Sequence, residues 1–252
     1  MTEPILTVQR LTHTFPNGNG GLLTLEDISF EVCPREFVCV LGPSGSGKTT
    51  LLHLLSGLLT PSEGTIILEG ARVLGPPRGV GIVFQDANLM PWRTVLQNIT
   101  LPLEIARTPR VRAAALASEL IELVGLSGFE DSLPRDLSGG MAQRVAIARA
   151  LVHDPDILLL DEPFGALDAL TRERMRSEML RIWHARQKTV VMVTHSINEA
   201  LFLADRVLVL SPRPAQLRLD LPVALPRPRT PEIIHTPEFG ALARQIRAAI
   251  QE

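Results

Sequence analysis

The stretch GPSGSGKTT at Gly42–Thr50 constrains the fold of this chain more than any other feature. It fits the pattern G-x-x-x-x-G-K-[ST], in which glycines let the backbone wrap closely around a phosphate group. The apolar run EFVCVLG precedes it, and the helical pattern KTTLLHLLSGLL follows it. This order of strand, glycine loop and helix predicts a phosphate-binding loop, where the helix N-terminus adds partial positive charge. We expect phosphate contacts from the whole loop: Gly42, Pro43, Ser44, Gly45, Ser46, Gly47, Lys48, Thr49 and Thr50.

Two residues of this loop have separate chemical roles. Lys48 is expected to reach the β- and γ-phosphates as a compact ammonium, and Thr49 to coordinate Mg²⁺. Of the 25 basic residues in the chain, only Lys48 and Lys188 are lysine. A guanidinium is planar and wider than an ammonium. The presence of lysine at position 48 of this arginine-rich chain therefore indicates that the geometry there requires the smaller group. The alternative, a merely flexible Gly/Ser turn, does not account for the strand and helix around it.

Polar side chains follow the other predicted strands where each one ends. Asp161 and Glu162 end the run ILLLDE, Gln85 follows GIVF, and His195 follows TVVMVT. A lone glutamine or histidine is usually a surface or core residue, but the carboxyl ends of parallel strands form the ligand-binding edge of α/β proteins. We expect Asp161 to hold Mg²⁺ through water and Glu162 to accept a proton from the attacking water. Glu162, His195, Gln85 and Lys48 are therefore the predicted catalytic residues.

The pattern of strands and helices predicts three regions. Strands alternate with helices over residues 1–91 and 154–211, which predicts a parallel, two-sided α/β core with short antiparallel strands at its N-terminus. Residues 92–153 are dominated by helical periodicity, as in VRAAALASELIELVGL, and are predicted to form an inserted helical subdomain. Residues 212–252 are proline-rich and end in the amphipathic pattern EFGALARQIRAAI, which predicts a tail with a C-terminal helix.

Composition narrows the classes of function. The chain has 252 residues and a formal net charge of −2, which gives no support for a nucleic-acid partner. The N-terminus lacks the pattern of a signal peptide, and no apolar run reaches the ~18 residues of a spanning helix, so we expect a cytosolic or peripheral protein. Cys33 and Cys39 lie around the strand EFVCVLG without metal-ligand companions, which favours two buried, reduced thiols.

A second glycine-opened helix, LSGGMAQRVAIARA at Leu137–Ala150, raises the question of why one chain needs two phosphate cradles. The phosphate loop, Gln85, LSGGM, LLLDEP, GALD and His195 occur in the order seen in ATP-binding-cassette ATPases, which the chain resembles over roughly residues 5–211. In that family two nucleotide-binding domains stack head to tail, and each signature motif caps the ATP held by the partner's loop. The resemblance implies that Ser138, Gly139 and Gly140 complete the ATP site of a second copy of this chain.

The same resemblance assigns further positions and a fold. It implies a P-loop NTPase (RecA-like) α/β core with an antiparallel β subdomain and an inserted α-helical subdomain. Phe15 is expected to stack on adenine, although a hydrophobic plug at a strand end is the alternative. Asp168 is expected at the dimer seam, His195 at the γ-phosphate, and Gln85 at Mg²⁺. The chain departs from the family pattern at Met141, where glutamine is usual, and this puts one hydrogen bond in doubt.

Finer resemblance is to the ATPase subunits of the nitrate/sulfonate/taurine group of bacterial importers, carried by FQDANLMPWRTVLQNI, DEPFGALDALTR and VTHSINEALFLADRVLVLSPRPA. It implies a separate transmembrane permease, indirectly a solute-binding protein, and a peripheral location at the cytoplasmic face of the membrane. Leu89, Met90 and Trp92 either receive a permease helix or belong to the core of the helical subdomain. Sulfonate, nitrate and pyrimidine-like solutes remain open. Two alternatives are a soluble ATPase driving a non-transport partner and a non-hydrolysing ATP switch, which Glu162 and His195 disfavour.

Overall fold

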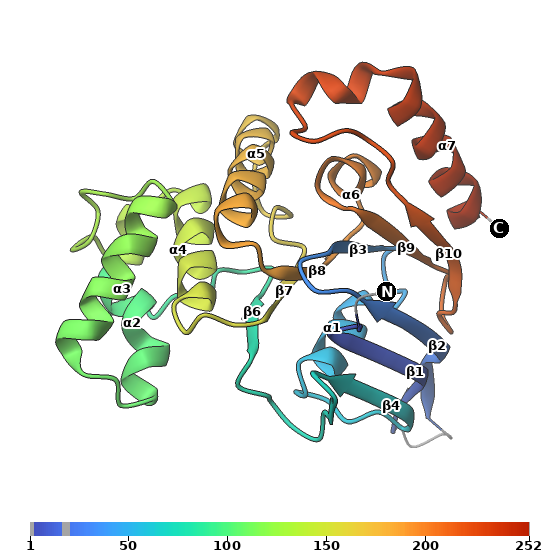
Figure 1. The fold of residues 1–252 in the computed structure, drawn as a ribbon, viewed down its shortest axis with the longest axis horizontal. Coiled ribbons are helices and arrows are strands. Elements are labelled where there is room, and N and C mark those ends of the chain that lie inside the picture. The colour runs from blue at the N-terminus through green and yellow to red at the C-terminus, as the bar shows by residue number, and fades with distance from the viewer. Residues whose placement is uncertain (1–2, 17–20, 252) are drawn as a thin grey trace. The chain divides into compact units, whose positions relative to one another are not determined.

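The computed structural model describes residues 3–16 and 21–251, which fold into two compact units (Figure 1). The first unit runs to Arg78 and resumes at Lys188, and the second is Gly79–Gln187. The turn PNGNGG, expected between the first two strands, lies largely outside the described residues. Among the described residues, no helix combines the length and the apolar character needed to cross a membrane.

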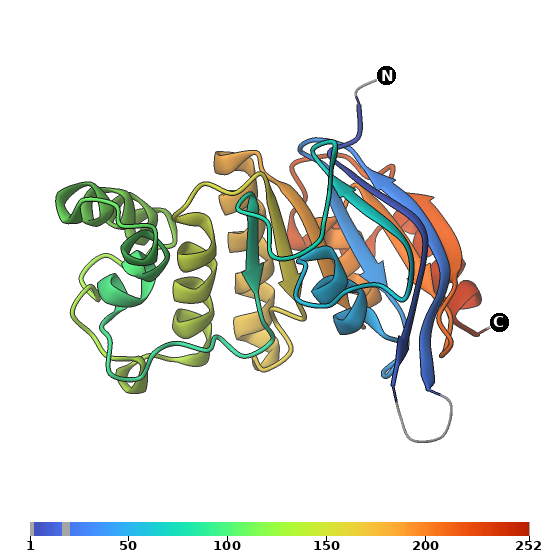
Figure 2. The same ribbon diagram turned by 90° about the horizontal axis from the view of Figure 1, so that it is seen from below.

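An antiparallel sheet begins the first unit. Its strand order is β2-β1-β4-β5, made by β1 (Leu6–Phe15), β2 (Leu22–Val32), β4 (Glu63–Leu68) and β5 (Ala71–Arg72). The long blue strands β1 and β2 run side by side in Figure 2. Burial roughly alternates along β2, which is the pattern of a sheet with one face in the core. The antiparallel strands expected at the N-terminus are therefore present, but β1 and β2, with 10 and 11 residues, are not short.

A parallel set of strands forms the rest of the first unit. β3 (Phe37–Leu41) pairs in parallel with β8 (Thr189–Thr194) on one side and with β9 (Arg206–Leu210) on the other. Every residue of β3 and β8 is buried, as expected of strands covered on both faces. The helix α1 (Lys48–Leu55) follows β3, and α6 (Ile197–Leu203) follows β8. The strand-loop-helix order predicted from the sequence is present at both places.

The C-terminal region is more ordered than its proline content suggests. The tail contains a strand, β10 (Leu217–Pro222), which pairs antiparallel with β9, and the sequence pattern did not predict it. After β10 come a 3₁₀ helix, η2 (Pro231–His235), and the expected helix α7 (Pro237–Gln251). Phe239 and Ile246 of α7 are buried, and the helix packs against α6, β9 and β10 (Figure 1). The tail is therefore part of the first unit's core.

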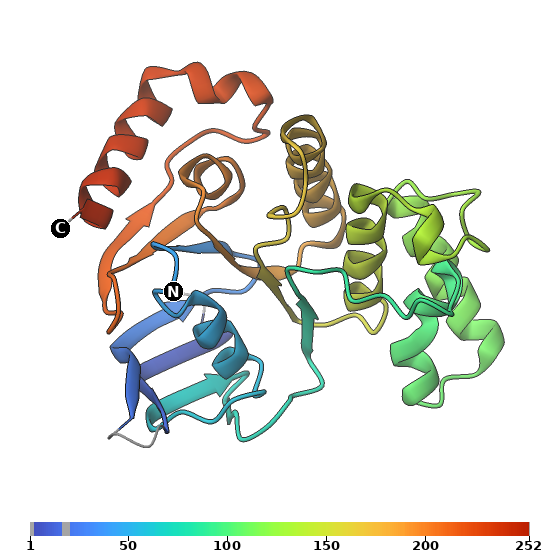
Figure 3. The ribbon, with the colours of Figure 1, turned by 180° about the vertical axis from the view of Figure 1, so that it is seen from behind.

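The second unit combines two parallel strands with helices. β6 (Val80–Val83) pairs in parallel with β7 (Ile157–Asp161), and α5 (Ala169–Arg186) follows β7. Between the strands lie α2 (Val95–Ile105), α3 (Arg110–Leu123), η1 (Pro134–Asp136) and α4 (Gly139–Leu151). The helices α2, α3 and α4 pack on one another and are the green group in Figure 3. Residues 92–153 contain no strand, in agreement with their helical periodicity.

The two cysteines have different environments. Cys39 lies within β3 and is fully buried, and this burial raises the pKa of its thiol well above the ordinary value. Cys33 is exposed because it comes directly after the last residue of β2, where the chain turns. The expectation of two buried thiols is therefore right for Cys39 and wrong for Cys33.

Candidate nucleotide-binding site

The glycine loop joins β3 to α1 in the first unit. Gly45 and Gly47 have φ of 77° and 92°, a backbone conformation that L side chains rarely adopt. A Cβ at Gly47 would lie 2.7 Å from Cγ2 of Thr24, whereas a Cβ at Gly45 would meet nothing within 4 Å. Gly47 is therefore required by packing beneath the loop, and Gly45 leaves its outer face open to close approach by a ligand.

The side chain of Lys48 is buried within this loop and bonds to its backbone. Its side chain is 6% exposed, and its Nζ donates hydrogen bonds to the carbonyls of Gly42 at 3.0 Å and Pro43 at 2.9 Å. In the described part of the chain no side chain caps the N-terminus of α1, and the buried Oγ of Ser46 has no hydrogen-bond partner. Backbone N–H groups at an uncapped helix start, together with an adjacent ammonium, fit a phosphate group.

Two further predicted residues lie in the first unit. His195 is exposed directly after β8, where the backbone N–H of Ser196 donates to Oγ1 of Thr194 at 3.1 Å. Phe15 is the last residue of β1 and is half-buried. Its ring meets His13 edge to face, with centroids 4.6 Å apart and an interplanar angle of 88°. This contact uses one side of the Phe15 ring, and such T-shaped packing is a usual arrangement of neighbouring rings.

The second unit brings Gln85, Glu162 and Gly165 together. A Cβ placed on Gly165 would lie 3.4 Å from Nε2 of Gln85 and 3.7 Å from Oε2 of Glu162. Asp161 is buried at the end of β7, and Glu162 is half-buried with φ of 41°. The positive φ at Glu162 is a strained backbone conformation, directly after the end of β7. The predicted base and the predicted glutamine therefore face the same small space.

The signature motif forms the start of α4. Ser138 is the N-cap, and its Oγ accepts the backbone N–H of Met141 at 3.3 Å. Gly139 is exposed, while Gly140 is buried where a Cβ would lie 2.8 Å from Cγ2 of Thr171 on α5. The cap uses only the backbone of residue 141, so methionine in place of glutamine does not disturb it. Ser138 and Gly139 remain exposed at a helix N-terminus.

Asp168 also caps a helix. Its Oδ1 accepts the backbone N–H of Thr171 at 3.1 Å at the start of α5. Hydrogen bonds from Thr171 lower the pKa of Asp168, so its carboxylate stays charged at neutral pH. Asp168 is exposed and presents a fixed negative charge on the surface of the second unit.

Two residues that the sequence interpretation missed bond to the backbone on either side of Gln85. The Arg149 guanidinium on α4 donates to the carbonyls of Ala87 at 2.7 Å and Asn88 at 2.8 Å. Gln143, six residues earlier on the same helix, donates to the carbonyl of Phe84 at 3.5 Å. Burial lowers the pKa of Arg149. The helix that begins at the signature thereby supports the loop that carries Gln85, and no local pattern could have indicated contacts across about 60 residues.

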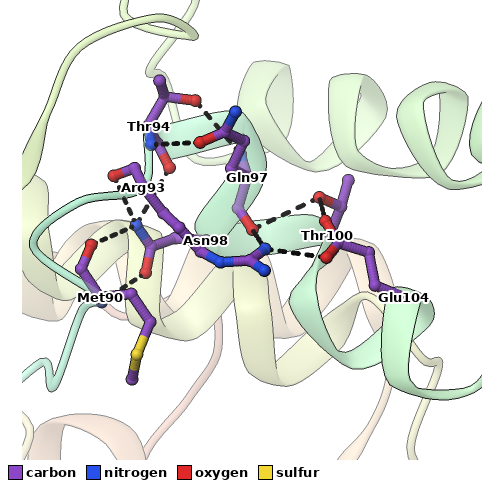
Figure 4. A network of polar contacts seen from close by, with 7 residues as sticks. All are labelled: Met90, Arg93, Thr94, Gln97, Asn98, Thr100 and Glu104. Atoms are coloured by element: carbon purple, nitrogen blue, oxygen red, sulfur yellow. Dashed lines mark hydrogen bonds and ion pairs between the residues drawn. The ribbon is translucent and has the colours of Figure 1, made fainter.

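A second polar network shapes the loop after Gln85 (Figure 4). Asn98 is completely buried, and its Nδ2 donates to the carbonyls of Met90, Arg93 and Thr94 at 3.3, 2.9 and 3.0 Å. Its Oδ1 accepts the N–H of Met90 at 2.8 Å. Trp92, at the tip of this loop, is 72% exposed. The alternative that Trp92 belongs to the core of the helical subdomain is therefore wrong.

Comparison with known proteins decides the family. Residues 25–165, more than half of the chain, match the ABC transporter family. The chain belongs to the ABC transporter family. It is an ATP-binding and ATP-hydrolysing subunit of this type, as the order of its motifs predicted.

Individual relatives cover nearly the whole chain. A nitrate import ATP-binding protein of Synechocystis sp. is 43% identical over 98% of this chain and 95% of that protein. A taurine import ATP-binding protein of Rhizobium johnstonii is 47% identical over 90% of this chain and 88% of that protein. A solved dimeric ATP-binding cassette in a post-hydrolysis state, bound to ADP and phosphate, is 31% identical, with a TM-score of 0.76 over 87% of this chain and 99% of that one. These likenesses confirm the predicted family and fold class.

The replacement Lys48→Ala tests the phosphate loop. It removes the ammonium that lies across the loop and should weaken nucleotide affinity by about 10–100-fold, the scale of one or two charge-assisted hydrogen bonds. Titration with a fluorescent ATP analogue measures this change. Lys188→Ala, at the other lysine of the chain, is the matched control and should bind normally. Equal affinity in both variants would contradict the assignment of the loop.

Proposed function

We propose that this chain is the ATP-hydrolysing subunit of an importer for a small solute and works as a head-to-tail dimer. The observation that carries the proposal is that one chain has two glycine-rich helix starts, each with exposed residues: Ser44 and Gly45 at the first, Ser138 and Gly139 at the second. One is the loop ending at Lys48 in the first unit, and the other begins at Ser138 in the second. A helix N-terminus binds anions, and a single ATP needs only one phosphate loop. The second cradle is therefore assigned to an ATP on a partner copy.

The first unit would bind the nucleotide. Lys48 and the backbone of Gly42–Thr50 contact the β- and γ-phosphates, and the half-buried ring of Phe15 stacks on adenine. His195 contacts the γ-phosphate from the end of β8, where its exposed imidazole is accessible. The buried position of Lys48 supports this role, because the ammonium is held in place before the phosphate arrives.

The second unit would carry the hydrolytic groups. Glu162 takes a proton from the attacking water, and the amide of Gln85 orients that water beside it, as their shared proximity to Gly165 supports. Gln85 and Asp161 of this unit carry hard oxygen donors of the kind that Mg²⁺ prefers, as Thr49 does in the first unit. When bound, Mg²⁺ would neutralise negative charge on the phosphates. Arg149 keeps the loop of Gln85 in place through its backbone carbonyls.

Dimerisation would complete each site. Ser138 and the N–H groups of Gly139 and Gly140 face the γ-phosphate on the partner copy, and Asp168 lies at the seam. Two features support this arrangement. Exposed residues lie at both helix starts, and a cassette 31% identical to this chain was solved as a dimer with ADP and phosphate. ATP then joins the two copies, and hydrolysis releases them.

The transport partner is inferred from relatives and from one exposed loop. Relatives 43% and 47% identical carry the names of nitrate and taurine import proteins, which favours uptake of a small nitrogen- or sulfur-containing anion or zwitterion. ATP hydrolysis would drive a conformational change in a permease at the cytoplasmic face of the membrane. A solute-binding protein would deliver the solute to that permease. Trp92, with Leu89 and Met90 half-buried beside it, forms the contact for a permease helix. A soluble ATPase with a non-transport partner is the competing function.

Glu162→Gln should separate binding from hydrolysis. The amide keeps the size of the carboxylate but cannot accept the proton, so the ATPase rate should fall by about 10²–10⁴-fold while ATP is still bound. Phosphate release and nucleotide titration measure the two quantities. Glu173→Gln, on the exposed face of α5, serves as the control and should hydrolyse ATP normally. A normal rate in Glu162→Gln would show that another group is the base.

Purification of the native protein from membranes tests the importer assignment. A multi-span permease should copurify, and Trp92→Ser should reduce its recovery while the ATPase rate of the isolated subunit stays unchanged. Leu74→Ser replaces a comparably exposed residue, 78% against 72%, on the first unit and should not affect recovery. Recovery of a soluble or ribosomal partner in place of the permease would favour the competing function.

A further inference from the structure

The proline-rich tail has a specific attachment that the proposed function does not use. We call residues 223–229, VALPRPR, the strap; it follows β10 and lies against the carboxyl end of α6. Two of its arginines, Arg227 and Arg229, hold this attachment. In Figure 1 the strap belongs to the orange segment between β10 and α7.

Arg229 satisfies the end of α6 from inside the core. It is 6% exposed, and its Nη1 donates to the carbonyls of Leu201, Phe202 and Ala204 at 3.0, 3.2 and 2.6 Å. Its Nη2 donates back to the strap, to the carbonyl of Val223 at 3.4 Å. The last carbonyls of a helix have no partner within the helix, and a cation there also opposes the helix dipole. One side chain thus joins the strap to α6.

Arg227 completes the same helix end. Its Nη2 donates to the carbonyl of Leu203 at 2.7 Å, the one carbonyl in this turn that Arg229 does not reach. It also pairs with Asp205 at 2.7 Å, and the other oxygen of Asp205 accepts the N–H of Phe37 at 3.0 Å. Phe37 is the first residue of β3, the strand that leads into the phosphate loop. The strap is therefore bonded to α6 and, through Asp205, to β3.

The opposite end of α6 adjoins His195. The Oγ1 of Thr194 donates to the buried carboxylate of Glu199 at 2.6 Å and accepts the N–H of Ser196 at 3.1 Å. The Oγ of Ser196 in turn accepts the N–H of Glu199 at 3.3 Å. The residues on both sides of His195 are thus bonded to the first turn of α6. A movement of the helix would move the backbone that carries His195.

The length of α6 makes its far end important. The helix has seven residues, and helices this short are not stable on their own in water. Its position depends on contacts at its two ends and along its buried face. We propose that Arg227 and Arg229 are positioning residues for His195, which they fix through α6; the proposal rests on the proposed role of His195 at the γ-phosphate.

The electrostatics of Arg229 agree with this role. Burial, and then the nearby charge of Arg227, lower the pKa of Arg229 to about 10, so the guanidinium is still charged at neutral pH. A buried cation is stable only where hydrogen-bond acceptors surround it, and here these are backbone carbonyls of α6 and the strap. Replacing it leaves those carbonyls without their donor, which loosens the helix end.

A double-mutant cycle tests the proposal. Arg229→Met should lower kcat for ATP hydrolysis by about tenfold, within the ~10²-fold that a misplacement of about 1 Å costs a catalytic group. The affinity for a fluorescent ATP analogue should stay unchanged, because the phosphate loop is intact. In a His195→Ala background, Arg229→Met should cause no further loss of kcat, because the residue it positions is absent. Arg218→Met, at an exposed position of β10, is the control and should behave as the unmodified protein.

Each other outcome contradicts the proposal in a recognisable way. A full loss of about tenfold in the His195→Ala background would show that Arg229 acts independently of His195. An unchanged kcat in Arg229→Met would show that the strap does not position the site. If His195→Ala alone leaves kcat unchanged, the proposed role of His195 fails, and the inference fails with it. If Arg229→Met does not fold, the same cycle with Arg227→Gln decides, because that side chain is 19% exposed and less costly to replace.

Discussion

The proposed phosphate site of the first unit depends on the way Lys48 is held within its loop. Its ammonium donates to the carbonyls of Gly42 and Pro43, and this is possible only because the backbone doubles back on itself at Gly45 and Gly47 with positive φ. That conformation also directs N–H groups outward at the start of α1. The buried strand β3 before the loop fixes where this happens. The phosphate site that we propose is therefore charged and preorganised by one short stretch of sequence.

In the second unit, the proposed hydrolytic residues are held in place by contacts between distant segments. Glu162 and Gln85 lie near one another because Glu162 leaves β7 through a strained turn and because Arg149 holds the backbone after Gln85. Arg149 stands on the helix that Ser138 caps. The signature, proposed to meet the ATP of a partner copy, is thus bonded within its own unit to the loop that carries a proposed catalytic residue. This linkage gives a physical route by which dimerisation would affect Gln85.

Local patterns predicted the elements that depend on local physics. The phosphate loop and the buried strands follow from glycine freedom and apolar runs. The helix caps at Ser138 and Asp168 also depend on local chemistry, but the sequence interpretation gave these two residues other roles and did not predict the caps. Contacts between distant segments were not predicted. The strand β10 follows a proline-rich stretch, and its pairing partner β9 lies in a different part of the sequence pattern. The sequence around Arg229 does not distinguish it from a solvent-exposed arginine, because its bonds are to carbonyls of α6. Cys33 was wrongly predicted to be buried, because it lies one residue beyond the end of β2, where the chain turns and the side chain is exposed.

The central claim is that each ATP is shared between two copies of the chain. The most direct measurement is the mass in solution, by size-exclusion chromatography with light scattering, of Glu162→Gln protein mixed with ATP and Mg²⁺. The account predicts the mass of a dimer with ATP and of a monomer without it. It also predicts that adding Ser138→Arg restores the monomer while ATP remains bound, because the arginine blocks the partner's γ-phosphate. A monomer that holds ATP without the second substitution, or a dimer unaffected by it, would contradict the account.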